Sequence, residues 1–356
     1  MSFFSTTEKA FGLDISDQTL RLIQLAKIGK NFKIALYNEI KLPEGCLKKG
    51  KIIQPKVFSD HLKKLIETVS GHGSLSKKAV VSLPETETFI KNFQLEATNE
   101  IEAKKQLTEL LPQSIPWNIE DIYWDYEIIK ENNKIIGAVA GASSKDIIDD
   151  YLTVFTNTKI EPIVLEIESS AIYNLLIEHN NNHLPQIIVD IGKNRTGLFL
   201  YDGVTIQFAI SLPLSGDNIT NIIAEAIDLT KEQAEKAKLI CGLDTQKSQG
   251  AIAEILKPQL KNLSQNIIEA INFYYANFPQ AKEIKNIYLC GGGANLKNID
   301  QVIQEFSGIE TLISEPFKKI KNNYPKFFTK EKSQSFITAI GLALRGINPN
   351  SFYDHS

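Results

Sequence analysis

The sequence is poor in cysteine, has no strong excess of either charge and has no long apolar run. The three cysteines, Cys46, Cys241 and Cys290, are odd in number and far apart, which argues against a disulfide framework and against paired zinc ligands. Cys290 ends an apolar run, and we expect it to be a buried free thiol. A net charge of −3 offers no basic surplus to neutralise phosphates, so nucleic acid is not an expected partner.

A membrane span needs about 20 apolar residues, and no stretch reaches that length. The longest candidate, "FITAIGLALRGI", is shorter and contains Arg345. The N-terminal residues lack the basic and apolar pattern of a secretory signal. We therefore expect a cytoplasmic protein that meets a membrane only through a partner. With 356 residues, of which 43% are apolar, the chain has room for two to three domains.

A short pattern occurs twice in the chain. "FGLDIS" ends an apolar run with Asp14, and "IIVDIG" ends another with Asp190. Each copy is followed by two further strand-like segments and then by a helical pattern, from about residue 55 and from about residue 217. This recurrence predicts an internal duplication with two related lobes. Strand meanders of an ordinary mixed α/β protein are the alternative.

The rest of the chain predicts an insertion in each lobe. The first-lobe core is expected at 1–84, 159–185 and 325–356, with a small inserted α+β subdomain at 85–158. The second-lobe core is expected at 186–228 and 284–324, with a helical subdomain at 229–283 that includes a long helix from about 248 to 277. Thr230 and Gln233 have capping-box spacing. A final helix, 334–345, is expected to return to the first lobe.

Several segments have the composition of phosphate-binding turns. A tight turn after a strand can direct N–H groups at a phosphate, and an aspartate at the strand end can hold magnesium directly or through water. Three glycines, Gly291 to Gly293, lie between a strand and a helix, where close backbone approach and the helix N-terminus favour a nucleotide. Neither a P-loop nor a dinucleotide-binding fingerprint is present. Glu235 and Lys238 share a helix face, where an exposed ion pair is the simpler reading.

The order of these motifs resembles the actin, heat-shock chaperone and hexokinase superfamily: "LDIS", "VDIGKNRTG" and "CGGGANL". Within it the chain resembles the PilM family of type IV pilus assembly proteins, through "LPEGCLKKGKI", "VVSLPETETFIKNFQL" and "AEKAK". The resemblance implies an α/β actin-like ATPase fold with two duplicated ribonuclease-H-like lobes around a nucleotide cleft. It also implies an insert of the FtsA and PilM type in lobe 1 and a helical insert in lobe 2.

The same resemblance implies that ATP and Mg²⁺ are cofactors. Asp14 and Asp190 would face the metal, directly or through water, and Glu168 would orient the attacking water. The nucleotide-binding residues that it implies are Ser16, Asp17, Gln18, Thr19, Arg21, Gly192, Lys193, Asn194, Thr196, Gly216, Glu235, Lys238, Gly291, Gly292, Gly293 and Asn295.

Two positions depart from the family pattern. The first turn of the family has glycine followed by serines, whereas this chain has Ser16, Asp17, Gln18 and Thr19. An ionised Asp17 would repel phosphate if it faced it, unless it binds the metal or turns outwards. Ser215 replaces one glycine of the usual pair. Both changes led us to expect slow hydrolysis or none.

We therefore expect an ATP-binding scaffold of the inner-membrane platform of a type IV pilus or a related machine. A PilN-like membrane protein would place its short N-terminal tail in a groove between the first-lobe core and the insert. Other platform and motor proteins, or a second copy of the chain, are further partners that the resemblance allows. The alternatives are a small-molecule kinase of the same superfamily and an FtsA-like cell-division protein. A kinase would need a base beside its acceptor site, and the sequence shows no evident candidate. The terminal "GINPNSFYDHS" lacks the amphipathic helix expected of the FtsA type.

Overall fold

The computed structural model describes residues 10–29, 31–131, 134–176, 184–203, 205–278, 281–318, 320 and 325–347. The chain divides into two compact units. Unit 1 comprises Met1–Ile177, Lys318–Pro325 and Thr338–Ser356, and unit 2 comprises Glu178–Phe317 and Lys326–Ile337. The finer four-part division remains a prediction. The sequence reading of the last residues, 348–356, lies outside the described part.

The core of unit 1 is a six-stranded sheet with the order β11-β7-β1-β2-β3-β6. Its strands are β1 (Phe11–Ser16), β2 (Thr19–Ile28), β3 (Asn31–Lys41), β6 (Ser70–Gly71), β7 (Lys78–Leu83) and β11 (Glu161–Ile167). β1 pairs antiparallel with β2 and parallel with β7. The alternation along β1 buries Phe11, Leu13 and Ile15 in one cluster, because successive side chains of a strand point to opposite faces.

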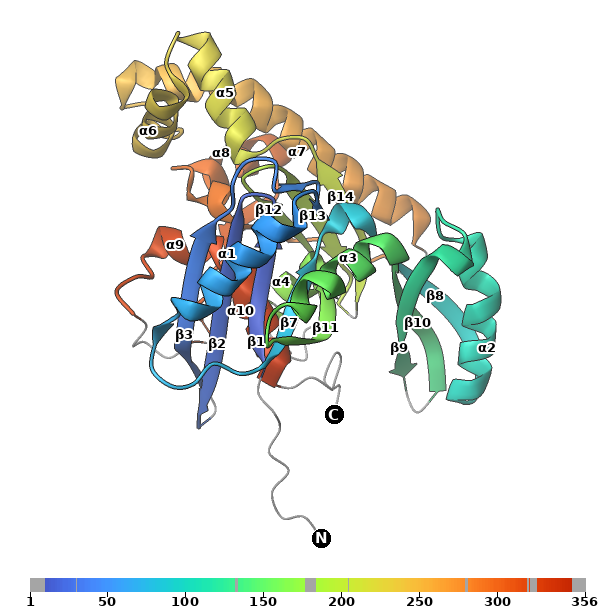
Figure 1. The fold of residues 1–356 in the computed structure, drawn as a ribbon. Coiled ribbons are helices and arrows are strands. Elements are labelled where there is room, and N and C mark those ends of the chain that lie inside the picture. The colour runs from blue at the N-terminus through green and yellow to red at the C-terminus, as the bar shows by residue number, and fades with distance from the viewer. Residues whose placement is uncertain are drawn as a thin grey trace. The chain divides into compact units, whose positions relative to one another are not determined.

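Helices cover both faces of this sheet. They are α1 (Pro55–Glu67), α3 (Lys145–Thr156), α4 (Glu168–Leu176) and α10 (Ile337–Ile347). α1 and α3 lie on one face and contribute to the cluster of Phe11 and Leu13, while α10, in red, lies behind β1 (Figure 1). A two-stranded hairpin, β4 (Leu47–Lys48) with β5 (Lys51–Ile52), precedes α1. The sequence analysis did not predict this hairpin.

The insert of unit 1 is a three-stranded sheet with the order β8-β10-β9 and one covering helix. Its elements are η1 (Glu85–Glu87), β8 (Thr88–Ala97), α2 (Glu100–Leu110), η2 (Leu111–Gln113), η3 (Ile119–Asp121), β9 (Ile122–Glu131) and β10 (Lys134–Ser144). The N-cap of α2 is Asn99, whose side chain accepts from the Glu102 backbone N–H. The Glu102 carboxylate accepts from the Thr98 N–H. The cap therefore reaches one residue further back than a standard capping box.

Unit 2 repeats the strand order of unit 1. Its sheet has the order β14-β13-β12-β15-β16, formed by β12 (Gln186–Ile191), β13 (Thr196–Tyr201), β14 (Ile206–Leu212), β15 (Asn286–Cys290) and β16 (Glu310–Ile313). β12 pairs antiparallel with β13 and parallel with β15, as β1 does with β2 and β7. Read from β16, the order matches β11-β7-β1-β2-β3. The predicted duplication is thus confirmed.

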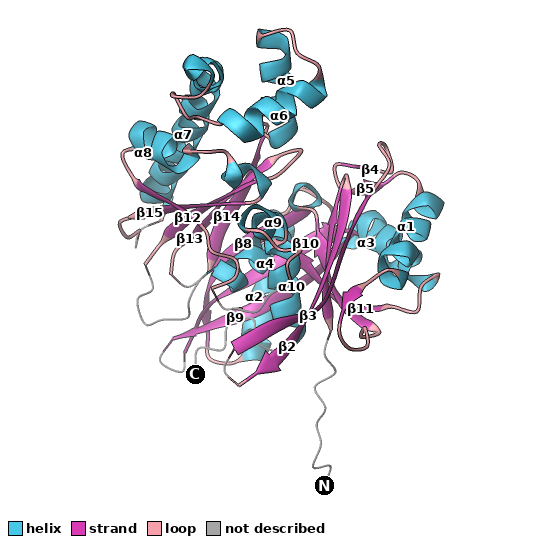
Figure 2. Ribbon diagram, turned by 90° about the vertical axis from the view of Figure 1, so that its left-hand side faces the viewer, coloured by secondary structure: helices cyan, strands magenta, loops and turns pink. Residues whose placement is uncertain are grey.

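The helices of unit 2 are α5 (Gly216–Ala226), α6 (Lys231–Cys241), α7 (Ala251–Asn277), α8 (Ile299–Ser307) and α9 (Lys330–Ser335), with 3-10 turns η4 (Ser248–Gly250) and η5 (Gly292–Asn295). α7 and α8 pack on the sheet in one apolar cluster with β12 and β15 (Figure 2). Thr230 and Gln233 form the predicted capping box of α6.

Two predicted helices begin or continue differently in the structure. The final helix, predicted over 334–345, is divided at Phe336, which ends α9 with φ −101° and ψ 7° while its ring packs against Phe328. The long helix predicted from Ser248 begins at Ala251, because Gln249 adopts a positive φ of 52°. Among the residues described here, no helix combines the length and apolar character that crossing a bilayer requires.

Candidate nucleotide-binding site

The first predicted turn lies between β1 and β2 in unit 1. Asp14 is buried near the end of β1, and its register partner on β2 is Arg21. Arg21 Nη1 lies 3.1 Å from Asp14 Oδ2, and its Nε donates to Glu39 Oε1 at 3.0 Å. The arginine therefore neutralises two carboxylates. A metal at Asp14 would bind next to this guanidinium group.

Asp17 occupies the turn itself, and both of its carboxylate oxygens accept hydrogen bonds from backbone amides. Gly50 N donates to Oδ1 at 2.8 Å, and Lys49 N donates to Oδ2 at 3.0 Å. These amides belong to the β4–β5 hairpin. Of the orientations left open by the sequence, the structure shows the carboxylate turned to this hairpin. Repulsion between Asp17 and phosphate is therefore no longer a reason to expect slow hydrolysis.

The neighbours of Asp17 complete the turn. Ser16 Oγ donates to Thr19 O at 3.0 Å. The carbonyl of Gln18 accepts from Leu42 N at 2.9 Å. The predicted set Ser16, Asp17, Gln18 and Thr19 is thus a tight connection between two strands, bonded both within itself and to neighbouring segments.

The second predicted turn lies between β12 and β13 in unit 2 and is joined to the start of α5. Gly216 N donates to Gly192 O at 3.0 Å, and Asp217 N donates to Lys193 O at 2.9 Å. Thr196 is buried, and its hydroxyl donates to Leu214 O at 2.8 Å. Three predicted segments, the turn with Asn194, Thr196 and Gly216, are therefore brought together.

Ser215 has a structural role that the sequence analysis missed. Its side chain is the N-cap of α5 and accepts from Asn218 N at 3.1 Å. A glycine at this position could not supply that bond. The substitution thus stabilises the helix start beside the turn.

The glycine turn after β15 packs directly on Asp190 and Ile191. A Cβ added at Gly291, where φ is +78°, would collide with the Asp190 carboxylate, and one at Gly293 would collide with the Ile191 side chain. At Gly292 the nearest atom to an added Cβ is Ser335 Oγ at 3.9 Å. Packing on β12 therefore explains two of the glycines. Gly292 is the position where the missing side chain leaves room for another group.

The helix expected immediately after the glycines begins later than predicted. η5 follows Gly291, and α8 starts at Ile299 after Asn298, which has a positive φ of 63°. Asn295 Nδ2 donates to Glu331 O at 2.9 Å and so ties this turn to α9. The N–H groups next to β12 are thus those of the glycine turn. The N-terminus of α8 does not directly follow that turn, because η5 lies between them.

Asp190 lies beside a buried thiol. Cys290, its register partner on β15, is fully buried, as the sequence predicted. Burial, together with the negative charge of Asp190 and a hydrogen bond to it, raises the pKa of Cys290 well above its usual value. The thiol therefore stays protonated at neutral pH.

Glu235 and Lys238 form a network with the start of α5 rather than an isolated surface pair. Lys238 Nζ lies 2.7 Å from Glu235 Oε2 and donates to Gly216 O at 3.0 Å and Thr220 Oγ1 at 2.8 Å. Burial alone would raise the pKa of Glu235, but hydrogen bonds from Lys238 and Thr220 outweigh it and hold the pKa below its usual value. All three ammonium protons of Lys238 thus have acceptors within the protein.

Thr220 was not identified from the sequence. It is almost fully buried, and its hydroxyl also contacts the Glu235 carboxylate. The only signal in the sequence was a threonine four residues after Gly216, one turn along the same helix. Threonine is common on helix faces, so this signal is weak.

Glu168, predicted to orient water, is the first residue of α4 and is half-buried. The next residue, Ser169, donates its N–H and its hydroxyl to the Glu85 carboxylate at 3.2 and 3.0 Å. The start of α4 is therefore fixed to η1. The role of Glu168 stays a prediction.

The residues described in the structure contain no cluster of three or more histidine, cysteine, aspartate or glutamate side chains arranged for a metal ion. Magnesium in nucleotide sites is held by one or two carboxylates together with phosphate oxygens and water. Asp14 and Asp190 are the carboxylates predicted to face such a metal, and this role stays a prediction. Asp14 lies in unit 1 and Asp190 in unit 2.

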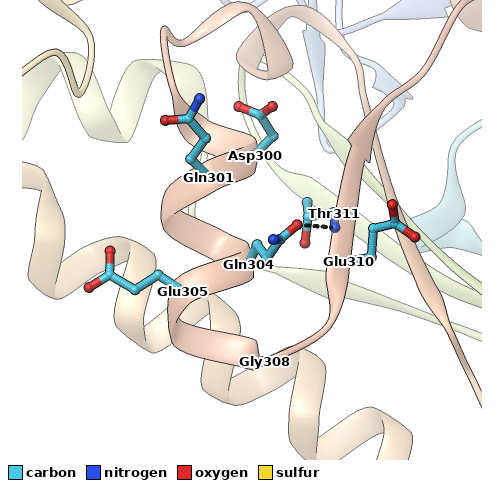
Figure 3. Close-up of a pocket in the computed structure, with 7 residues that line it drawn as sticks. All are labelled: Asp300, Gln301, Gln304, Glu305, Gly308, Glu310 and Thr311. Atoms are coloured by element: carbon cyan, nitrogen blue, oxygen red, sulfur yellow. Dashed lines mark hydrogen bonds between the residues drawn. The ribbon is translucent and has the colours of Figure 1, made fainter.

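A separate open pocket of about 440 Å³ lies between α8 and β16 (Figure 3). Gln304 Oε1 accepts from Thr311 N at 3.1 Å within it. Its lining residues are Asp300, Gln301, Gln304, Glu305, Gly308, Glu310 and Thr311. Three carboxylates would repel phosphate groups, and none of these residues was predicted to bind nucleotide.

The repeated strand order, with an aspartate near the end of the central strand of each sheet, defines an actin-like α/β protein. The family model described as type IV pilus assembly protein PilM matches residues 12–347. The chain therefore belongs to the PilM family of type IV pilus assembly proteins.

Solved structures show the same fold. A PilM–PilN type IV pilus biogenesis complex has a TM-score of 0.78 at 21% identity, covering 96% of this chain and 99% of that one. The ethanolamine utilization protein EutJ from Carboxydothermus hydrogenoformans has a TM-score of 0.57 at 16% identity, covering 94% and 89%. MreB5 of Spiroplasma citri bound to ADP has a TM-score of 0.53 at 13% identity, covering 95% and 96%.

One curated relative is the cell division protein FtsA of Buchnera aphidicola subsp. Baizongia pistaciae (strain Bp), which is 27% identical over 206 residues. The match covers 49% of this chain and 47% of that protein. The chain thus spans about half the length of this relative.

Proposed function

We propose that the protein is an ATP-binding scaffold of the type IV pilus assembly platform. The observation that carries this proposal is the convergence, within unit 2, of the Asp190 strand end, the turn at Gly192 and Lys193, the start of α5 and the glycine turn. These are backbone-rich elements around one carboxylate, as nucleotide phosphates with a metal require.

In this proposal ATP binds with Mg²⁺, and Asp14 and Asp190 hold the metal directly or through water. The metal neutralises the phosphate charge when it is bound. Lys238 and Thr220 orient Glu235 toward the ribose, and Gly292 gives the nucleoside space. Glu168 would orient a water for slow hydrolysis. Family membership and the actin-like neighbours, one of them bound to ADP, support nucleotide binding.

The partner in this proposal is the cytoplasmic tail of a PilN-like membrane protein, which would bind in a groove between the core of unit 1 and its insert. A PilM–PilN complex among the similar structures supports this choice. Such a partner would hold the protein at the inner membrane from the cytoplasmic side. Other platform and motor proteins, and a second copy of the chain, would then assemble around it.

Titration with a fluorescent ATP analogue, with and without Mg²⁺, tests the nucleotide part. Asp190→Ala should weaken Mg²⁺-dependent binding at least tenfold, because the phosphate site loses a metal-facing carboxylate. Glu305→Ala, which removes an exposed carboxylate of the same unit, is the matched control and should bind as the wild type does. Absence of binding to the folded wild type would overturn this part of the proposal.

Fluorescence anisotropy with synthetic tail peptides of PilN-like proteins tests the partner. Saturable binding that a scrambled peptide does not reproduce is the expected result. If no tail peptide binds and the protein instead phosphorylates a sugar at about 10 per second or faster, the scaffold gives way to a kinase.

A further inference from the structure

The tip of the β4–β5 hairpin forms hydrogen bonds with three other segments of unit 1: the first turn, η1 and α3. Its two central residues, Lys49 and Gly50, donate their backbone N–H groups to the Asp17 carboxylate. Both have positive φ, 52° at Lys49 and 82° at Gly50. A left-handed lysine is unfavourable without such bonds, so Asp17 helps to maintain the hairpin conformation.

The carbonyls of the same two residues are held by other elements. Gly50 O accepts from the Tyr151 hydroxyl at 2.9 Å, and Tyr151 is fully buried in α3. Lys49 O accepts from the Thr86 hydroxyl of η1 at 3.2 Å. An added Cβ at Gly50 would collide with the ring of Pro84, so the hairpin tip has no room to shift on that side.

These contacts lie where the chain enters and leaves the insert. η1 immediately precedes β8, and α3 immediately follows β10. The two crossings are also joined to each other, because Ser143 Oγ donates to Glu87 O at 2.8 Å. The hairpin therefore binds the first phosphate turn on one side and both crossings to the insert on the other.

We propose that Asp17 is a positioning residue that couples nucleotide binding at the first turn to partner binding at the insert. A phosphate that fixes the backbone of the turn also fixes the Asp17 carboxylate. The carboxylate fixes Lys49 and Gly50, and these set the positions of η1 and α3. The inference rests on the proposed function, and coupling of this kind is reciprocal between the two ligands.

The coupling factor is the ratio of the tail-peptide Kd without nucleotide to that with saturating ATP and Mg²⁺. We expect it to differ from one by about fivefold or more in the wild type. In Asp17→Asn the factor should move to within twofold of one, measured with enough ATP and Mg²⁺ to saturate the variant. Asp60→Asn, an exposed aspartate on α1, is the matched control and should keep the wild-type factor.

Two further measurements keep the test independent of one variant. Thr86 is exposed, so Thr86→Val should fold normally. Like Asp17→Asn, it should move the coupling factor toward one. Hydrogen exchange without ligands should show faster exchange in Asp17→Asn at the amides of Lys49 and Gly50 and also at residues 85–88.

The outcomes separate this inference from the proposed function. A wild-type protein that binds both ligands with a coupling factor of one overturns the coupling and leaves the scaffold intact. A wild-type factor that Asp17→Asn preserves, or exchange that changes only at Lys49 and Gly50, also overturns it. A wild-type protein that binds neither ligand overturns the proposed function, and the coupling with it.

Discussion

Glu166, near the end of β11, is the most deeply buried carboxylate of unit 1, with 2% of its surface exposed. Its Oε2 lies 3.4 Å from Arg345 Nε on α10. Burial raises the pKa of Glu166 to about 8, although Arg345 acts in the opposite direction and Glu127 adds to the rise. Desolvation of the charged form is therefore larger than the attraction of the arginine.

This shift predicts a loss of stability as the pH rises. Between its ordinary pKa of 4.5 and about 8, Glu166 is ionised in the unfolded chain and protonated in the folded one. The folded state then binds more protons, so the free energy of unfolding falls with rising pH, at up to about 1.4 kcal/mol per pH unit from this group. Urea denaturation at pH 5.5, 6.5, 7.5 and 8.5 measures the slope.

Glu166→Gln should remove this contribution, because the amide does not titrate. The variant should gain stability relative to the wild type as the pH is raised from 5.5 to 8.5. Glu232→Gln, which alters an exposed glutamate on α6, should leave the slope unchanged. A wild-type slope that Glu166→Gln does not alter would contradict the assignment.

The site residues differ in how well the sequence predicted them. Asp14 and Asp190 were predicted at strand ends because each ends an apolar run, and they lie near the ends of β1 and β12. The orientation of Asp17 was not predictable, because it depends on a hairpin whose two-residue strands have no detectable period. Thr220 was missed since its role depends on where α6 lies against α5, which no local pattern specifies.

At the scale of elements, α10 packs against β1 and α4 through glycines. An added Cβ at Gly12 would collide with the Ala339 carbonyl of α10, and one at Gly341 would collide with the Ala171 carbonyl of α4. Backbone therefore meets backbone on both sides of α10.

This packing predicts that Gly341→Ala destabilises the protein even though alanine favours a helix. The helix preference gains up to about 1 kcal/mol, whereas overpacking costs about 1–3 kcal/mol and the backbone of α4 cannot yield as a side chain would. We expect a lower urea midpoint. In Gly141→Ala the nearest atom to the new Cβ, Ile167 Cδ1, is 3.6 Å away, so this control should remain near the wild type. Equal urea midpoints for Gly341→Ala and Gly141→Ala would contradict the close packing of α10 on α4.

The elements themselves were predictable where the periodicity was strong. The alternation of β1 to β3 and of β12 to β14 predicted the duplication, and the insert was predicted as a small α+β unit. The break at Phe336 was missed because its apolar neighbours continue the helical pattern without interruption. At the break the Phe336 ring packs edge-on against Phe328, a contact that the helical spacing does not reveal.

At the scale of the whole molecule, each unit has a hydrophobic core of its own. The cluster that contains Phe11 and Phe58 belongs to unit 1, and the cluster that contains Val189 and Leu260 belongs to unit 2. Proteins with separate cores need not unfold in a single transition. A ligand that binds residues of both units stabilises both, whereas a ligand held by one unit stabilises that unit alone.

The two tryptophans make this difference measurable. Trp117 and Trp124, the two that the sequence contains, both belong to unit 1, so their fluorescence reports the unfolding of that unit, while circular dichroism reports both. At a ligand concentration of 100 times Kd the stabilisation is about 2.7 kcal/mol, a rise of roughly 5–11 °C in the midpoint for units of this size. We expect ATP with Mg²⁺ to raise the fluorescence midpoint although neither tryptophan is a predicted nucleotide residue. Asp14→Ala should diminish that rise. A fluorescence midpoint that stays constant while the circular dichroism midpoint rises would mean that unit 2 alone holds the nucleotide.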